Sequence, residues 1–550
     1  MENLYIIDAI GPFFKPNTTK TINWSKIPFS KLEKENRLSP EIQERILKDF
    51  DRFLHQANSL GYNAISVDDL PHLVVFDFYS DAVKETLSKF IGLYQKLFSI
   101  ARQMDMKIFV NTDIMFYNSE IRHYLEENDI RSIEFLRSAV ERCIETYPIS
   151  GMIFRIGESD GMDVEGIFKS RLKLKTPKQV NECIHMLLPI FEKNDRSMIF
   201  RTWTVGVFPI GDLMWNKKTY DKTFGNIASP NFIVSMKYGD TDFYSGLDLN
   251  PLFFHGDHQK ILELQTRRER EGFGEFPYYV GWQYEIYARQ LKDCRTLRGI
   301  SVWCQTGGWT RWNNRTFLEH SSRWNELNTC AAIRIFKDDQ SADSCIETFF
   351  GSKDRISFIK QYTRFFQEIL YPQEALSRIF FFRRLRVPPC LWLFWDAVTL
   401  SSTILAFYRF IGISPPGITE KDLEELRDSG KEFGIEDVDY YIDSLKMLLQ
   451  FRRVIHEPCA EEELIRISEN FKKAYPNTFK FRIHSVERMP RFKILFFNLI
   501  LRPKAAYRLI DRILLLPFVS RIVRHLLTKN PKNMPKFVNK RAMNMNLIFK

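Results

Sequence analysis

No two of the eight cysteines in this chain form a CxxC pair, and their spacings resemble no disulfide framework. Pairs of this kind are the usual signature of a zinc site or a redox motif, so we predict no metal and no cofactor. The chain also does not begin with a basic segment followed by a long apolar segment, as a secretory signal peptide does. We therefore expect a cytoplasmic protein.

Acidic residues are almost missing from the C-terminal end of the sequence. Residues 488–550 hold fifteen Lys and Arg against one acid, Asp511, so the net charge of this segment is +14. The whole chain has a net charge of +11, so residues 1–487 together carry −3. The segment has no Trp, and Tyr507 is its only tyrosine. Because single-stranded nucleic acids bind through aromatic stacking, we predict no nucleic-acid partner.

The basic segment instead has a membrane-like pattern. Between residues 491 and 527, apolar runs alternate with Arg and Lys at about helical spacing, and Pro503 and Pro517 divide the stretch into short helices. Basic amphipathic helices of this kind lie in the membrane interface and are attracted to anionic lipids. We expect residues 488–550 to hold the protein peripherally on the inner membrane face. Packing of these helices against the rest of the protein is the alternative, and the sequence leaves both open.

Eight short apolar runs alternate with longer amphipathic stretches such as 40–60 and 82–104. The chain is 44% apolar and 27% charged, the balance of a folded protein. Strands alternating with helices predict an α/β fold, a (β/α)8 TIM barrel over residues 1–330. The expected strands are Leu4–Ile7, Ala64–Val67, Lys107–Val110, Gly151–Ile156, Met198–Trp203, Phe232–Met236, Ile261–Thr266 and Ile300–Cys304.

Strand signals fade after about residue 331, and helical periodicity takes over. This change predicts an α-helical domain over residues 331–487, followed by the basic tail 488–550. Within the helical domain, Leu391–Tyr408 is an 18-residue apolar stretch that contains Asp396. Its length touches the minimum for a membrane span, whereas an ionised Asp is costly in lipid. A buried helix and a membrane-associated helix are both compatible with this stretch.

Acidic residues follow several of the expected strands, at the end of a barrel where active sites are found. Helix capping accounts for single cases. Hydrolysis of a glycosidic bond uses two carboxyl groups, one as proton donor and one as base or nucleophile. The candidates for these roles are Glu158, Asp160, Asp242 and Glu269.

Cationic and aromatic residues accompany these acids. Arg155, Arg201 and Lys237 either bind a carboxylate on the substrate, which Arg does bidentately, or neutralise the acidic cluster. Trp rings stack on sugars or fill cores. We count seven residues as candidates for substrate binding: Arg155, Arg201, Trp203, Lys237, Asp240, Trp282 and Trp303.

Five segments, in order, resemble glycoside hydrolase family 67, the α-glucuronidases. FRIGESDG at Phe154–Gly161 is similar to the family's VKADSEG, and MIFRTW at Met198–Trp203 is similar to IVMWRAF. The segment at Ile233–Phe243, IVSMKYGDTDF, is similar to VIVQIKNGPIDFQ. The segment at Leu262–Glu269, LELQTRRE, is similar to LEFQITQE, and IRIFKDDQS, at the end of Trp324–Ser341, is similar to FGRLAWNPDLS.

The resemblance implies an inverting hydrolase of an acidic oligosaccharide or polysaccharide, with a helical domain after the barrel. It puts Asp160 at the position of the general acid, while the nearby Glu158 is the more usual acid type; both stay candidates. It puts Asp242 at the base position with Glu269 as its partner. We expect the barrel to start at residue 4, which would leave no room for the family's N-terminal β-sandwich, and the basic tail has no counterpart in the resemblance.

Two alternatives remain open beside an α-glucuronidase-like enzyme. The same scaffold can carry an enzyme with another sugar specificity, because fold does not fix substrate. The other alternative is a membrane-associated protein that binds glycans or takes part in polysaccharide assembly.

Overall fold

The computed structural model describes the barrel region of the chain in most detail. The described residues are 2–9, 27, 29–33, 38–156, 166–170, 173–203, 209–211, 213–239, 243, 249–266, 278–304, 323–353, 355–357, 359, 360, 363, 424, 427 and 428.

Eight parallel strands form a closed barrel in the order β1-β10-β9-β8-β7-β5-β3-β2. Each of the eight strands predicted from the sequence is present, so the predicted (β/α)8 fold is confirmed. The strands are β1 (Leu4–Asp8), β2 (Ala64–Asp68), β3 (Lys107–Asp113), β5 (Gly151–Arg155), β7 (Ser197–Arg201), β8 (Phe232–Lys237), β9 (Gln259–Gln265) and β10 (Leu297–Trp303). A separate antiparallel pair joins β4 (Phe116–Tyr117) to β6 (Lys169–Ser170).

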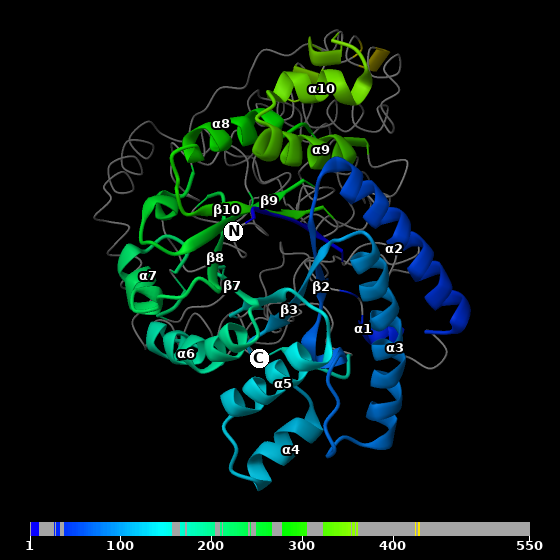
Figure 1. Ribbon diagram of the computed structural model, residues 1–550, viewed down its shortest axis with the longest axis vertical. Helices are drawn as coiled ribbons and strands as arrows, with labels where there is room; N and C mark the ends of the chain where they lie inside the picture. Colours follow the sequence, from blue (N-terminus) through cyan, green and yellow to red (C-terminus); the bar gives the residue numbers. More distant parts are fainter. Residues whose placement is uncertain are drawn as a thin grey trace, which may run out of the picture.

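Helices surround the barrel on the outside (Figure 1). Neighbouring helices pack on each other in pairs, and α9, which follows the last strand, packs on α2, which follows the first. The helices are α1 (Phe29–Leu32), α2 (Pro40–Leu60), α3 (Asp81–Gln103), α4 (Ser119–Glu127), α5 (Ser132–Thr146), α6 (Pro177–Lys193), α7 (Lys217–Phe224), α8 (Gly281–Leu291), α9 (Arg323–Asp338) and α10 (Ala342–Phe350), with the 3-10 turns η2 (Leu70–His72) and η3 (Pro251–Phe254).

Local sequence signals fix where the helices begin and end. Helix α2 has Pro40 in its first turn, where the missing N–H costs no hydrogen bond. It ends at Gly61, whose φ of 105° lies in the left-handed region that a residue without Cβ adopts easily. At α6, Thr176 and Gln179 exchange side chain to backbone hydrogen bonds in a capping box.

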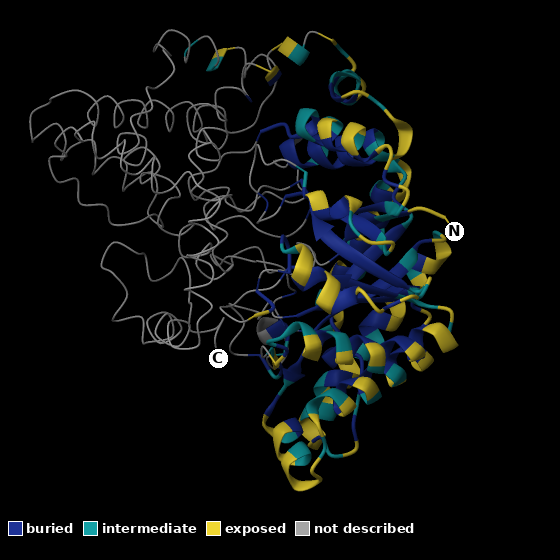
Figure 2. Cartoon of the chain, turned by 90° about the vertical axis from the view of Figure 1, so that its left-hand side faces the viewer, coloured by how far each residue is buried: buried dark blue, intermediate teal, exposed yellow. Residues whose placement is uncertain are grey.

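The strands separate two apolar cores, because alternate side chains point to opposite faces of a strand. One face packs on the helices, and the other fills the barrel. Figure 2 shows the strands as buried and the outer faces of the helices as exposed. We call the inner cluster the floor: it consists of Leu4, Ile6, Ala64, Phe109, Ile153, Ile199, Ile233 and Ile261.

The predicted domain boundary at residue 330 falls inside α9, which packs on α8 and β10. Most of the predicted helical domain, including Leu391–Tyr408, and all of the tail 488–550 lie outside the described residues. In the part of the chain that the structure describes, no helix has the length and apolar character needed to cross a bilayer. The six cysteines in that part are buried and form no disulfide.

Candidate active site at the barrel mouth

Charged side chains line the barrel above the floor. On seven strands, a polar or charged residue near the C-terminal end lies an even number of positions after a floor residue, so it points inward as the floor does. Trp303 of β10 lies against one of these residues, Arg201. We call this set the mouth: Asp8, Asp68, Asp113, Arg155, Arg201, Lys237, Gln265 and Trp303.

The charges of the mouth are divided between its two sides. The carboxylates of Asp8, Asp68 and Asp113 come from the adjacent strands β1, β2 and β3. The three cationic side chains come from the next strands around the barrel, β5, β7 and β8. All six residues are buried, and none is more than 6% exposed.

Arg155 joins the two sides. Its side chain is fully buried, with Nε 2.7 Å from Oδ1 of Asp113 and an Nη atom 3.5 Å from Oδ1 of Asp68. Asp68 is on β2 and Arg155 is on β5, which are separated by β3, so this contact crosses the barrel interior. Ser170 donates a hydrogen bond to the other carboxylate oxygen of Asp113. The arginine therefore pairs with acids from two different strands.

Arg201 makes a second buried pair, with Glu263 inside β9. Its Nε and an Nη atom donate to the two carboxylate oxygens of Glu263, each at 2.8 Å, and Ser235 donates to the same carboxylate at 2.8 Å. Burial opposes the ionisation of Glu263, but the charges of Arg201 and Lys237 and the hydrogen bonds together hold its pKa below the usual range. Glu263 is thus an anion that orients Arg201, whose guanidinium lies 4.5 Å from the centre of the Trp303 ring.

Lys237 lies between two aromatic rings. Its ammonium is 3.6 Å from the centre of the Trp203 ring and 4.3 Å from that of Phe243. An ammonium in such a position is attracted by the negative faces of both rings. The arrangement fixes the direction of the cation at the end of β8.

The structure brings together five of the residues predicted to bind substrate: Arg155, Arg201, Lys237, Trp203 and Trp303. The pairing of the two arginines with buried acids favours, for those two, the interpretation that they neutralise carboxylates. Each of the two Trp rings contacts a cation. The structure places Trp282 elsewhere, on α8, where its Nε1 donates to Asp343 of α10 at 2.8 Å.

The predicted catalytic acids, Glu158, Asp160, Asp242 and Glu269, and the predicted binding residue Asp240 lie outside the described residues. Each of them nevertheless follows the end of a described strand. β5 ends at Arg155, shortly before Glu158 and Asp160, and β8 ends at Lys237, shortly before Asp240 and Asp242. β9 ends at Gln265, shortly before Glu269. All five therefore follow strands that end at the mouth, and their roles stay predictions.

Glu263 is a functional candidate that the sequence analysis missed, as are Asp8, Asp68 and Asp113 of the mouth. Glu263 lies within the run ILELQ, whose pattern predicts a strand that is followed by the candidate acid Glu269. Strands of a parallel barrel are buried on both sides and are usually apolar throughout. A carboxylate in phase with the inward-facing Ile261 is therefore a signal that identifies such a residue.

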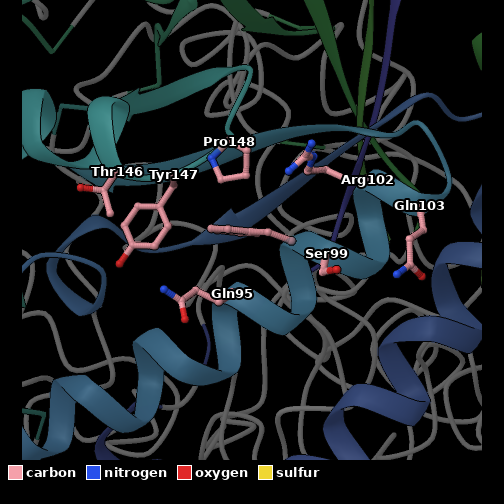
Figure 3. Close-up of a pocket in the computed structure, with 8 residues that line it drawn as sticks. Gln95, Ser99, Arg102, Gln103, Thr146, Tyr147 and Pro148 are labelled. Atoms are coloured by element: carbon pink, nitrogen blue, oxygen red, sulfur yellow. The ribbon is translucent and has the colours of Figure 1, made fainter.

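A hollow of about 480 Å³ lies between α3 and residues 146–148 at the end of α5 (Figure 3). Its walls come from the C-terminal ends of α3 and α5, which directly precede the starts of β3 and β5. It therefore lies near the N-terminal end of the barrel, where conserved features of TIM barrels serve stability and not catalysis. Among the described residues, no group of three His, Cys, Asp or Glu is arranged to hold a metal ion.

No protein-family model and no curated protein matches this chain. Solved structures are similar to this chain at low identity and with TM-scores below 0.5. One is described as a GH138 enzyme targeting pectin rhamnogalacturonan II, with 12% identity and a TM-score of 0.48 over 86% of this chain and 62% of that chain. Another is a family 89 glycoside hydrolase from Clostridium perfringens, with 10% identity and a TM-score of 0.47 over 99% of this chain and 61% of that one.

A third match is an O-GlcNAc hydrolase from Thermobaculum terrenum, with 12% identity and a TM-score of 0.37 over 88% of this chain and 96% of that chain. The chain thus spans less than two thirds of the length of the first two enzymes. The barrel fold itself is established by the strand pairing of this chain.

Proposed function

We propose that this protein is a glycoside hydrolase that acts on an acidic oligosaccharide or polysaccharide, with α-glucuronidase-like specificity and inversion at the anomeric carbon. The observation that supports this proposal best is the mouth. Carboxylates from three adjacent strands face cations from the next three strands, at the end of a (β/α)8 barrel where active sites lie.

The proposed chemistry uses the acids that follow these strands. Glu158 or Asp160 after β5 protonates the leaving oxygen, and Asp242 after β8 removes a proton from the attacking water with Glu269 as its partner. Lys237 at the end of β8 is our candidate for the substrate's carboxylate, because the Trp203 and Phe243 rings direct its ammonium. Arg155 and Arg201 set the positions of the surrounding carboxylates.

The purified full-length protein should be tested on aryl uronides and acidic oligosaccharides, with proton NMR to identify the anomer first released. We expect hydrolysis with inversion, and we expect Asp242→Asn to lower kcat by about 10²–10⁴-fold. Comparing Glu158→Gln with Asp160→Asn on a substrate with a good leaving group identifies the general acid. A good leaving group needs no protonation, so the variant that lacks the acid keeps more of its activity on this substrate. Binding of these glycans without any hydrolysis would instead support the glycan-binding alternative.

We also propose that residues 488–550 attach the enzyme to the inner membrane face, because apolar runs alternate with basic residues there. The full chain should float with anionic liposomes, less so at high salt, whereas a chain ending at Glu487 should not. Equal flotation of both chains, or of neither, contradicts attachment through the tail.

A further inference from the structure

A buried histidine lies between two carboxylates beside the mouth. His72, at the end of η2, has Nδ1 2.6 Å from Oδ1 of Asp69 and Nε2 2.9 Å from Oε1 of Glu33. The three side chains are 2%, 8% and 6% exposed. Since both ring nitrogens face a carboxylate oxygen, the geometry suits a doubly protonated, cationic imidazole. We call this group the clamp: Glu33, His72 and Asp69.

Aromatic rings enclose the clamp. The imidazole stacks on Phe29 with 3.7 Å between ring centres, and the edges of Phe90 and Phe168 approach it at 4.9 and 5.3 Å. The charged groups that act most strongly on the ring are Asp69 and Glu33. Burial lowers the pKa of His72, but the two carboxylates outweigh burial and raise it from 6.5 to about 9.

The clamp joins three connections that leave the barrel at the same end. Glu33 follows α1 in the connection after β1, and His72 and Asp69 lie in the connection after β2. The second carboxylate oxygen of Glu33 accepts a hydrogen bond of 2.9 Å from the backbone N–H of Ile167, in the connection after β5. Phe168, next to Ile167, packs on the imidazole itself.

The segment held in this way continues into the mouth. Ser170 lies three positions after Ile167 and donates to Asp113, whose other oxygen binds Arg155. Asp69, on the other side of the clamp, directly follows Asp68, which also binds Arg155. The clamp therefore contains the residue after Asp68 and contacts the segment whose Ser170 binds Asp113.

We propose that the Glu33–His72–Asp69 clamp is a positioning device: it holds residues 167–170 and thereby fixes Asp113 and Arg155 on the acidic side of the mouth. Its importance for catalysis rests on the proposed function, but its effect on this segment does not. His72 contacts no reacting atom in this scheme, and its cationic form is what keeps Glu33 directed at Ile167.

The test is hydrogen–deuterium exchange on the full chain with His72→Gln and Glu33→Gln. We expect the Ile167 amide to exchange about tenfold faster in both variants at neutral pH, because Glu33→Gln takes the charge from its acceptor and His72→Gln removes the cation that directs this acceptor. Exchange in α6 and in the barrel strands should stay unchanged. The matched control is His123→Gln, which removes an exposed pair with Glu127 at 3.0 Å and should alter nothing in residues 166–170.

The wild-type protein gives a second measurement that does not depend on a variant folding. Because the pKa of His72 is raised, its cationic form stabilises the folded clamp fully below the unfolded-state pKa of 6.5. This stabilisation is lost as the pH rises through the folded-state pKa of about 9. After correction for intrinsic exchange, protection of residues 166–170 should therefore fall across this range before that of the strands. Equal exchange in all variants, or a loss of protection spread evenly over the barrel, overturns the proposal.

Activity separates this inference from the proposed function. If uronides are hydrolysed, His72→Gln should lower kcat with a smaller change in KM, and the part of the fall in kcat that follows the titration of His72 near pH 9 should be absent. If the clamp variants change exchange in residues 166–170 but the protein hydrolyses no uronide, the positioning role of the clamp is supported and the proposed function is not.

Discussion

The floor and the mouth of the barrel are buried to a similar degree but are filled by opposite chemistry. No floor residue is more than 6% exposed, and the side chains of Arg155, Arg201 and Glu263 are at most 3% exposed. The floor stabilises the barrel through apolar area removed from water. The buried ion pairs have a desolvation cost that often equals or exceeds their attraction, so apolar residues would stabilise this end as well or better.

Stability is therefore not what accounts for charges at the mouth. The two ends also differ in position: chemistry in TIM barrels is placed at the C-terminal ends of the strands, which is where the ion pairs are. Substitutions at the two ends should consequently differ in kind as well as in size. Floor substitutions should change stability alone, and mouth substitutions should change stability and activity together.

The largest effect is expected for Glu263→Gln. The change removes the carboxylate that pairs with the buried Arg201, and breaking such a pair costs about 3–5 kcal/mol of unfolding free energy. Urea unfolding followed by circular dichroism measures it. The control is Lys89→Met, which removes an exposed pair with Glu85 at 2.9 Å and should cost less than about 1 kcal/mol. Similar losses in the two variants would contradict the role assigned to Glu263.

The same pair predicts a pH dependence. The pKa of Glu263 is lowered below 4.5, so its ionised form contributes stability above that pH, and the contribution is lost as pH falls through the folded-state pKa. The gap in unfolding free energy between wild type and Glu263→Gln should be largest near neutral pH and should shrink in acid. Unfolding series from about pH 7 to pH 3 measure the gap. A gap that stays constant over this range speaks against an ionised Glu263.

The strands were predictable because each contains a short apolar run followed by polar residues. Gly151–Ile156 was expected and Gly151–Arg155 was found, and the helix expected at residues 40–60 is α2. The ion pairs were not predictable in this way. Arg201 and Glu263 lie on strands separated by β8, so only closure and register of the barrel bring them together.

Aromatic residues show the same limit of sequence analysis. Trp203, Trp282 and Trp303 were indistinguishable as candidates for sugar stacking, since each lies in or near a strand end or loop of the predicted barrel. The structure distinguishes them by their partners. Trp203 contacts Lys237, Trp282 donates to Asp343, and Trp303 contacts Arg201. Contacts of this kind depend on side-chain direction in three dimensions, which hydrophobic periodicity does not specify.

A smaller effect is expected at the floor, for Ile199→Val. Removing one buried methylene group costs about 0.5–1.5 kcal/mol of unfolding free energy. Because Ile199 lies below the mouth, kcat and KM of the folded protein should not change. Ile286→Val is the matched control, since Ile286 on α8 is 45% exposed and should lose almost nothing. A change in kcat with Ile199→Val would mean that the floor and the mouth are not independent.

The smallest effect is expected for Trp203→Phe, on KM for an acidic substrate. Phe keeps an aromatic face under the Lys237 ammonium but attracts a cation less strongly than Trp does. A loss of about 0.5–1 kcal/mol raises KM by about 2–5-fold. If the ring directs Lys237 toward a carboxylate, the change appears with an aryl uronide and is absent with the neutral aryl glycoside of the same ring. If the ring instead stacks on the sugar, both substrates are affected equally. Trp282→Phe should leave KM unchanged for both, because the partner of Trp282 is Asp343.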